Sequence, residues 1–253
     1  MEELEQDLIK LPAPQKQGGP GIYGCLKERR SFRHFLQKPI SLTDLSQLLW
    51  CADGISDDES KYRTAPSAFA VFPMEIHVIT RDGFYHYNAE ELCLERRFKG
   101  NPLGQMAKER AAIAYTMSAP VVVMISSVID RFKRWIFPPD HGGPFLPKEW
   151  HAYATVSLIF EAAHICQNLV LAATGLGMTG VPVCHFSRNR VRTILQLDKE
   201  PFKISDIHYL VPIAYPDLKR AKVLDKDWDH IRRMSIPEYT SYNVKEGEEP
   251  YAL

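Results

Sequence analysis

Three arginines stand in five residues beside a hydroxyl, in the segment Arg29-Arg30-Ser31-Phe32-Arg33. Guanidinium groups bind a phosphate dianion through paired, charge-assisted hydrogen bonds, and a serine hydroxyl adds one more donor. These residue types therefore favour a phosphate site. The alternative is a solvated basic turn in which an arginine pairs with Glu28.

Small residues follow a proline at Pro66-Ser67-Ala68. Small side chains allow backbone N–H groups to approach a flat ligand closely. The alternative is an ordinary loop, which this segment taken alone favours.

A third candidate is the run Val181-Pro182-Val183-Cys184-His185-Phe186. Backbone amides that follow a buried strand could meet the edge of a ring. Cys184 and His185 also suggest a nucleophile and its base. Adjacent residues of a strand point to opposite faces, however, so these two cannot easily share a proton, and a Cys/His hydrolase is disfavoured.

Basic residues return at Lys219 and Arg220. They form a solvated face unless they join the Arg29 cluster at a phosphate. His164 is expected to be a core histidine, since the H-E-x-x-H spacing of a zinc site is absent. The five cysteines are odd in number and never form C-x-x-C, so neither a disulfide framework nor a zinc site is expected.

The element that must position these groups is a long helix that begins near Trp150. It is apolar on nearly every face, which predicts a buried helix, and Gly175 is expected to end it with a left-handed cap. Polar residues form a stripe along it that would be costly in lipid, namely Glu161, His164, Gln167 and Asn168. We therefore expect a soluble protein with this helix in its core.

The segment from Gly175 to Gly180 matches the dinucleotide-binding pattern G-x-G-x-x-G. That motif requires a strand before the glycines and a helix after them, so that phosphate meets a helix N-terminus. Here a helix comes first and a strand is expected to follow. We reject the dinucleotide interpretation.

Around the long helix, hydrophobic periodicity predicts further elements. Helices are expected from Ser41 to Asp53 and from Gln105 to Met117, with a short helix capped by Ser187. Strands are expected at Met74–Thr80, Phe84–Asn88, Val121–Ile125, Val181–Val183 and His208–Tyr215, the first two as a hairpin. Residues 11–24 read as an extended arm, and the irregular stretch 131–147 reads as a lid or a disordered loop. The order predicts one α+β domain with a central helix under a sheet.

The composition excludes some partners. The 253 residues carry no net formal charge, and the pI is near 7.1, so no general field favours nucleic acid or anionic lipid. Without an apolar leader at the N-terminus, a cytoplasmic protein is expected.

Taken together, these segments resemble the flavin-dependent nitroreductase family, most closely its SagB-type oxidoreductase branch. The resemblance lies in RRSFRHF (29–35), PISLTDLSQLLWCADG (39–54), RTAPSAFAVFPMEIHVI (63–79), GFYHYN (83–88), APVVVMI (119–125) and HICQNLVLAATGLGMTGVPV (164–183). It implies a mainly antiparallel sheet flanked by helices in an intertwined homodimer. The corresponding boundaries are an arm over 1–25, an FMN-binding domain over 26–234 and a tail over 235–253.

The resemblance also implies how FMN is held at the dimer interface. Arg29, Arg30, Ser31 and Arg33 would bind the phosphate and ribityl chain, with Lys219 or Arg220 closing that site. Pro66, Ser67 and Ala68 would lie against the isoalloxazine, and the backbone of Pro182, Val183 and Cys184 would approach its N5 edge. No residue is assigned a catalytic role; His185, Tyr85 and His86 are candidates for proton donors.

The activity that the resemblance implies is hydride transfer by a ping-pong mechanism, from NAD(P)H to a nitro, quinone or enone acceptor. One alternative is a SagB-type dehydrogenase that oxidises azoline rings in a modified peptide. Another is a flavin-binding protein without turnover. The sequence departs from the usual P-S-A-G-A-L-Y-P of the SagB branch at Phe69 and Phe72, and it has Cys184-His185-Phe186 where a glycine is common. These changes are expected to reshape the pocket at the flavin face.

Overall fold

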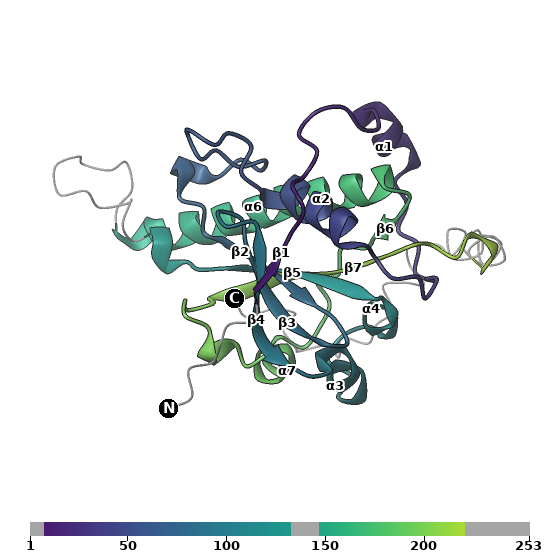
Figure 1. The fold of residues 1–253 in the computed structure, drawn as a ribbon. Coiled ribbons are helices and arrows are strands. Elements are labelled where there is room, and N and C mark those ends of the chain that lie inside the picture. Colours follow the sequence, from purple (N-terminus) through teal and green to yellow (C-terminus); the bar gives the residue numbers. More distant parts are fainter. Residues whose placement is uncertain (1–7, 133–146, 221–253) are drawn as a thin grey trace, which may run out of the picture. The chain divides into compact units, whose positions relative to one another are not determined.

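The structure is a computed structural model that describes residues 8–132 and 147–220. The chain divides into two compact units, Met1–Pro216 and Asp217–Leu253. The first unit contains a mixed arrangement of helices around one sheet, shown in Figure 1. This confirms the predicted α+β class.

In the described residues, the sheet has seven strands in the order β1-β4-β3-β2-β5-β7-β6, and every pair is antiparallel. The predicted hairpin is confirmed as β2 and β3, and β5 lies inside the sheet with every residue buried. The bounds are β1 Leu8–Lys10, β2 Met74–Ile79, β3 Gly83–Asn88, β4 Cys93–Lys99, β5 Val121–Ser127, β6 Thr179–Gly180 and β7 Asp206–Ala214.

Helices cover both faces of this sheet (Figure 1). The helices α2 and α6 pack on one face, and α3, α4 and α7 pack on the other. The bounds are α1 Ile22–Glu28, α2 Leu42–Asp53, α3 Pro102–Lys108, α4 Ala114–Ser118, α6 Pro147–Gly175 and α7 Arg188–Ile194, with short 3-10 turns at η1 Ala68–Ala70 and η2 Leu197–Lys199.

The helix α6 is the long core helix that the sequence predicts. Its inner face, with Leu158, Ala162, Ile165 and Leu169, is buried against α2 and the sheet. Its outer face is not buried within one chain, because Val156, Ile159 and Phe160 are 46%, 50% and 60% exposed. The expectation of burial on nearly every face therefore holds for one side only.

By length and composition alone, His151–Gly175 is a helix that could cross a membrane. Half of its most apolar window is buried inside the protein. Because that half packs against other elements of the same unit, α6 serves here as the core helix of the fold.

The glycines after α6 have structural roles that explain the misleading motif. The helix ends at Gly175 as expected, but the left-handed residue is Gly177, with φ of 71°. The Met178 amide donates to the Ala173 carbonyl at 2.7 Å and the Gly177 amide donates to the Thr174 carbonyl at 3.0 Å, which is the Schellman pattern. A helix C-terminus faces these glycines, so they do not form a phosphate loop.

The N-terminal arm is more structured than predicted. Leu8–Lys10 pairs with β4 as an edge strand, and α1 already begins at Ile22, inside the segment expected to be extended. The buried side chain of α1 is Cys25, whose sulfur lies against Gly175 at the end of α6. The contact of Cys25 with the core therefore stabilises a helix that the Pro and Gly content of the arm does not indicate.

Three other expectations need correction. The helix predicted over Gln105–Met117 is broken into α3 and α4, with left-handed backbone at Arg110. The strand predicted at Val181–Val183 is reduced to an isolated bridge between Val183 and Leu210, because Pro182 has no N–H for a continuous ladder. Ser187 precedes α7 but makes no side-chain cap.

Two expectations fall on residues that lie outside the described ranges. These are most of the proposed 131–147 lid and the whole of the 235–253 tail.

Close packing at Gly180 yields a prediction for Gly180→Ala. A Cβ there would lie 2.9 Å from Cγ1 of Val170 and 3.1 Å from Cδ1 of Ile213. We expect a loss of about 1–3 kcal/mol in the free energy of unfolding, measured by chemical denaturation. Gly24→Ala is the control, since nothing lies within 4 Å of its Cβ and alanine favours its helix. Equal stability of the two variants would contradict this account.

Candidate functional site

The arginine segment follows α1 and is folded around its own backbone. The guanidinium of Arg30 donates to the carbonyls of Lys27 and Arg29 at 2.8 and 2.7 Å, and that of Arg33 donates to the Ser31 carbonyl at 3.1 Å. Arg30 is exposed, while Arg29, Ser31 and Arg33 are half-buried. These local bonds fix the turn and keep several cationic donors close to the surface.

A hydrogen bond joins this segment to the chain that follows α6. The hydroxyl of Thr179 donates to the Arg30 carbonyl at 3.0 Å. Farther along, Phe35 bridges to Pro216 after β7. The arginines therefore lie beside β6, and Figure 1 shows α1 at the C-terminal end of α6.

The predicted N5-side residues belong to the same region. Val183 is buried, and both its amide and its carbonyl pair with Leu210, at 3.2 and 2.9 Å. Pro182 and Cys184 are exposed on either side of it. Any backbone donor that this strip offers to a ligand must therefore come from Cys184 or later, and not from Val183.

The Pro66-Ser67-Ala68 segment lies elsewhere along α6. It is near Glu161, because Ser67 and Ala68 lower the pKa of that buried carboxyl against the effect of burial. At a rise of about 1.5 Å per residue, α6 covers about 21 Å between Glu161 and Gly175. One chain thus brings the arginine segment to Thr179, three residues before Pro182, and it holds the 66–68 segment near a different turn of the core helix.

The loop that carries this segment has an unusual backbone. Phe69, Ala70 and Phe72 have φ of 56°, 52° and 48°, in the left-handed region that favours glycine. Such a conformation costs about 1–3 kcal/mol for each non-glycine residue and needs support from its surroundings. Phe69 stands where the P-S-A-G-A-L-Y-P motif of the SagB branch has a glycine. Its backbone adopts a left-handed conformation that glycine adopts without strain.

Several hydrogen bonds support the loop from inside. The Phe72 amide donates to the Ser67 hydroxyl oxygen at 2.9 Å, and Arg131 donates to the Phe72 carbonyl at 2.7 Å. The guanidinium of Arg63 lies 5.6 Å from the centre of the Phe72 ring. The strained residues are thus held at both ends of the turn.

Two buried carboxyl groups lie beneath the loop. Burial raises the pKa of Asp53 to about 8, although the Arg63 guanidinium 3.5 Å away acts in the opposite direction. Burial also raises the pKa of Glu161 to about 7, opposed by the hydrogen bonds from Ser67 and Ala68. Asp53 reads from sequence as the end of a helix, and only the fold places it beside Glu161 and Arg63.

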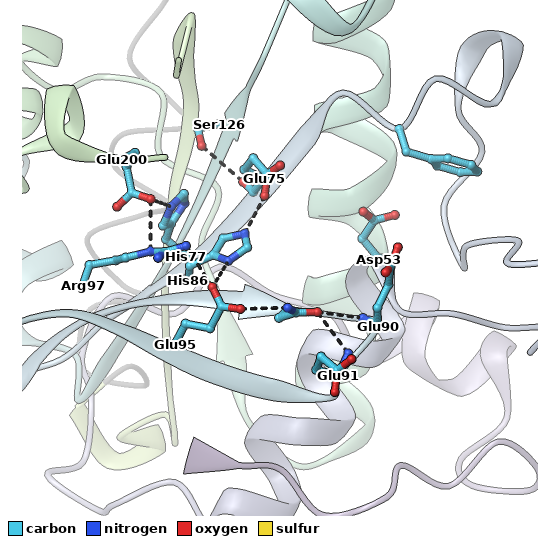
Figure 2. A network of polar contacts seen from close by, with 12 residues as sticks. Asp53, Glu75, His77, His86, Glu90, Glu91, Glu95, Arg97, Ser126 and Glu200 are labelled. Atoms are coloured by element: carbon cyan, nitrogen blue, oxygen red, sulfur yellow. Dashed lines mark hydrogen bonds and ion pairs between the residues drawn. The ribbon is translucent and has the colours of Figure 1, made fainter. Parts of the chain in front are cut away.

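A larger polar network crosses the neighbouring strands, as Figure 2 shows. The two ring nitrogens of His86 lie 2.5 Å from Glu75 and 3.1 Å from Glu95. Arg97 pairs with Glu95 at 2.9 Å and with Glu200 at 3.1 Å. Burial acts to raise the pKa of Glu75, but the bond from His86 and the charge of Arg131 outweigh it, so that pKa lies below its ordinary value.

Sequence reasoning missed this network. Its signal was the alternation of Glu75 and His77 within an otherwise apolar strand, which puts polar groups on one face of β2. The network reaches the loop through Arg131, which pairs with Glu75 and also bonds the Phe72 carbonyl. A cavity of about 360 Å³ lies between the polar network and this loop. Its lining includes Asp53, Arg63, Glu75, Tyr87 and Arg131.

The other candidates are placed as follows. Tyr85 and His86 are buried in β3, so they are poorly placed to deliver a proton to an incoming substrate, whereas His185 is exposed. Lys219 and Arg220 belong to the second unit, and their part in a phosphate site stays a prediction.

The raised pKa of Asp53 predicts a pH effect on stability. Between about pH 4, the ordinary pKa of an aspartate, and the pKa of about 8 in the folded chain, the folded state holds a proton that the unfolded state has lost. This group therefore makes stability fall as pH rises, by at most about 1.4 kcal/mol per pH unit. Asp53→Asn should flatten the decline measured by chemical denaturation from pH 5 to 8.

The exposed Asp82 supplies a matched control for this measurement. Asp82→Asn should leave the pH profile of the wild type unchanged. Parallel profiles for the wild type and Asp53→Asn would show that the Asp53 carboxyl gains no proton on folding.

Comparison with known proteins agrees with this fold. The family model described as "Nitroreductase family" matches residues 26–215. A protein named as a nitroreductase in Methanocaldococcus jannaschii is 31% identical over 191 residues, which cover 72% of this chain and 87% of that protein.

Solved structures show the same fold at lower identity. A protein described as a nitroreductase from Ralstonia eutropha matches with a TM-score of 0.65 and 22% identity, over 85% of this chain and 91% of its own. A chain of the Escherichia coli microcin synthetase McbBCD complex, with truncated pro-MccB17 bound, matches with a TM-score of 0.54 and 17% identity, over 72% of this chain and 66% of its own.

The family model spans three quarters of the sequence, and the antiparallel sheet packed on a long core helix is the fold that these solved structures share. The chain belongs to the nitroreductase family and is an oxidoreductase enzyme of that family.

Proposed function

We propose that the protein is an FMN-dependent oxidoreductase that takes reducing equivalents from NAD(P)H and passes them to a nitro, quinone or enone acceptor. The observation that supports this proposal is the Thr179–Arg30 hydrogen bond, which joins the arginine segment to the chain three residues before Pro182. A cationic turn thereby lies next to a stretch of exposed backbone, as a phosphorylated ring compound requires.

The residues fit the chemistry of FMN. Arg29, Arg30 and Arg33 supply guanidinium donors and Ser31 a hydroxyl, which suits a phosphate dianion and a ribityl chain. The half-buried Ser67 and Ala68 offer a small surface for a flat ring. When bound, FMN supplies hydride transfer through its N5 atom, and the resemblance implies a ping-pong order of reductant and acceptor.

A homodimer completes the proposed site. The arginine segment and the 66–68 segment lie near turns of α6 about 21 Å apart along the helix, so two copies of the chain can contribute different halves. The outer face of α6 exposes Val156, Ile159 and Phe160, and exposed apolar patches of this kind mark interfaces. Burial of these side chains against a second copy would remove them from water.

In this proposal the protein positions the ligand and shields it from water. The arginines fix the phosphate end, and a backbone amide at or after Cys184 can donate toward the ring. A preorganised donor at this position stabilises negative charge that develops during reduction. The exposed His185 is the proton donor candidate that solvent and substrate can reach.

Two alternative functions are compatible with the position of Phe69. Its ring is 49% exposed, and it lies 5.9 Å from the ring of Tyr153 on α6. An aromatic pair beside Ser67 and Ala68 could shape a pocket for an azoline ring in a modified peptide. It could also cover the flavin face, which would leave a flavin-binding protein without turnover.

The direct test is the spectrum and mass of the purified protein. We expect a yellow dimer that releases FMN, and whose absorbance near the flavin maximum bleaches rapidly when NADH or NADPH is added under anaerobic conditions. Reoxidation by a quinone or a nitroarene should then restore the colour.

The alternative functions give different results in the same anaerobic reduction experiment. A yellow protein that neither nicotinamide reduces, but that an azoline peptide does, favours the dehydrogenase. Stable flavin without reduction by any donor favours a binding protein. A colourless monomer that does not bind added FMN at micromolar concentration would falsify the proposal.

The phosphate role of Arg33 is tested by Arg33→Ala. Loss of a charge-assisted hydrogen bond should weaken FMN binding by about 1.5–3 kcal/mol, which is on the order of 10- to 100-fold in Kd. Isothermal titration of the apoprotein measures this change. Arg81→Ala, in the exposed turn between β2 and β3, is the control for a lost surface charge. Unchanged retention of FMN in the Arg33 variant would remove this residue from the site.

A further inference from the structure

Phe69 is a large apolar side chain that the protein holds at its surface. The residue is 49% exposed, although phenylalanine is among the residue types most often buried. Its backbone is left-handed, with φ of 56° and ψ of 20°, which is unfavourable for a bulky residue. Strain of this kind gathers at functional sites, where the surrounding structure maintains it. The exposed ring therefore needs an explanation that burial in this chain does not provide.

Hydrogen bonds fix the turn that carries this ring. The Ala70 amide donates to the Ser67 carbonyl at 3.1 Å, and the Phe72 amide donates to the Ser67 hydroxyl oxygen at 2.9 Å. From the segment after β5, the Arg131 guanidinium donates to the Phe72 carbonyl at 2.7 Å. The ring is thus presented on a preorganised turn, and a ligand that contacts it pays little to order the loop.

A second aromatic ring lies beside Phe69. The ring centroid of Tyr153, on α6, is 5.9 Å from that of Phe69, and the two ring planes are inclined by 51°. Two tilted rings form a corner, so a flat molecule can stack on one of them while its edge meets the other. Both are geometries that aromatic pairs favour. The loop residues 66–72 carry no charged side chain, so this corner favours an uncharged ligand.

We propose that the corner between Phe69 and Tyr153 is a stacking site for the electron acceptor, and that it selects flat, conjugated ring systems such as quinones and nitroarenes over non-planar molecules. The identity of the occupant as the acceptor rests on the function proposed above, in which Ser67 and Ala68 lie against the flavin. The stacking site itself rests on the two rings and on the turn that holds them.

A second copy of the chain is the competing occupant. Val156 and Phe160 are exposed on the outer face of α6, so a copy that covers this helix could also cover Phe69. An interface gains from any apolar side chain at position 69, whereas a stacking site needs an aromatic ring at a fixed angle. The strained turn and its hydrogen bonds fix that angle, which favours the stacking site.

The test compares two probes that share one carbon skeleton. 2-Naphthol is flat and aromatic, whereas decahydro-2-naphthol is puckered and saturated. Neither is an electron acceptor, so isothermal titration of the purified protein, saturated with FMN where it binds FMN, measures binding alone. We expect the wild type to bind 2-naphthol about tenfold more tightly than decahydro-2-naphthol, since one or two aromatic pairs supply a gain of this order.

Variants at position 69 separate the ring from the turn. Phe69→Asn removes the ring and keeps the turn, because asparagine tolerates a left-handed backbone. It should weaken the binding of 2-naphthol about 3- to 10-fold and leave that of decahydro-2-naphthol nearly unchanged. Phe69→Tyr keeps a ring and should retain the preference. If Phe69→Asn fails to fold, Tyr153→Leu, which removes the second ring, should show the same loss.

Phe160→Ala is the matched control, because it removes a phenyl ring that is 60% exposed on α6 without touching the loop. It should leave the preference for 2-naphthol unchanged. An undiminished preference in Phe69→Asn overturns the proposal. So does a shift from dimer to monomer in Phe69→Asn, measured by sedimentation, because it would show that the ring packs in the interface.

Steady-state kinetics with 1,4-naphthoquinone separates this proposal from the proposed function. If both hold, Phe69→Asn raises KM about 3- to 10-fold and leaves kcat nearly unchanged, because it removes binding that does not change in the transition state. A higher kcat/KM in Phe69→Asn would show that the ring blocks the site, and it overturns the stacking role.

The two proposals also fail in different ways. If the wild type binds no FMN but the probe results are as expected, the proposed cofactor is wrong and the stacking site stands. If the bound flavin is reduced and reoxidised but the wild type binds both probes equally, the proposed function stands and the stacking site is overturned.

Discussion

The burial of one face of α6 is the constraint on which the rest of this structure depends. Leu158, Ala162, Ile165 and Leu169 fix the rotation of the helix against the sheet and α2. That rotation decides which polar residues of α6 face inward and which face outward. Glu161 is turned into the protein, while Gln167 is exposed. His164 is exposed as well, so the expectation of a core histidine is wrong. The same packing also places the C-terminal end of α6 against α1, which is where the arginine segment begins.

Strain and buried charge are linked in the loop beneath which Glu161 lies. A glycine at position 69 would adopt its left-handed backbone without steric cost, whereas Phe69, Ala70 and Phe72 all have such a backbone here and need support. The loop is supported by the Ser67 hydroxyl, which accepts from the Phe72 amide, and by Arg131, which donates to the Phe72 carbonyl. Burying acids in turn raises their pKa values, so Asp53 and Glu161 need the nearby Arg63 guanidinium. Polar groups that are far apart in the sequence thus meet around one strained turn.

The sequence was sufficient for those features that depend on local pattern. Alternation predicted the β2–β3 hairpin, and the apolar run Val121–Ile125 predicted an inner strand, because both signals act over a few residues. The rejection of the G-x-G-x-x-G motif held for the same reason, since the order of helix and glycines can be read directly. The arginine segment and the 66–68 segment were singled out from residue types, and their role in binding remains a prediction.

Features that depend on tertiary contact could not be predicted in this way. Nothing local distinguishes Asp53 from an ordinary helix end, and its neighbours Arg63 and Glu161 are far from it in the chain. The network of Glu75, His86 and Glu95 depends on the register of three strands. The left-handed backbone at Arg110 and the start of α1 at Ile22, with Cys25 buried, are not indicated by local helix propensity.

Likeness of fold does not determine which acceptor this enzyme reduces. The solved relatives share its sheet and core helix at 22% and 17% identity, and they include a chain of a microcin synthetase complex. Function depends on the site and not on the scaffold. In this chain the exposed ring of Phe69, beside Tyr153, takes the place that a glycine has in the resembling motif. If the 66–68 segment faces a ligand, as proposed, we expect a bulky residue there to reduce the space above it and to add an aromatic surface on which a flat molecule can stack. Substrate choice should therefore follow from the loop and from the groups that hold its conformation, more than from the core that all members share.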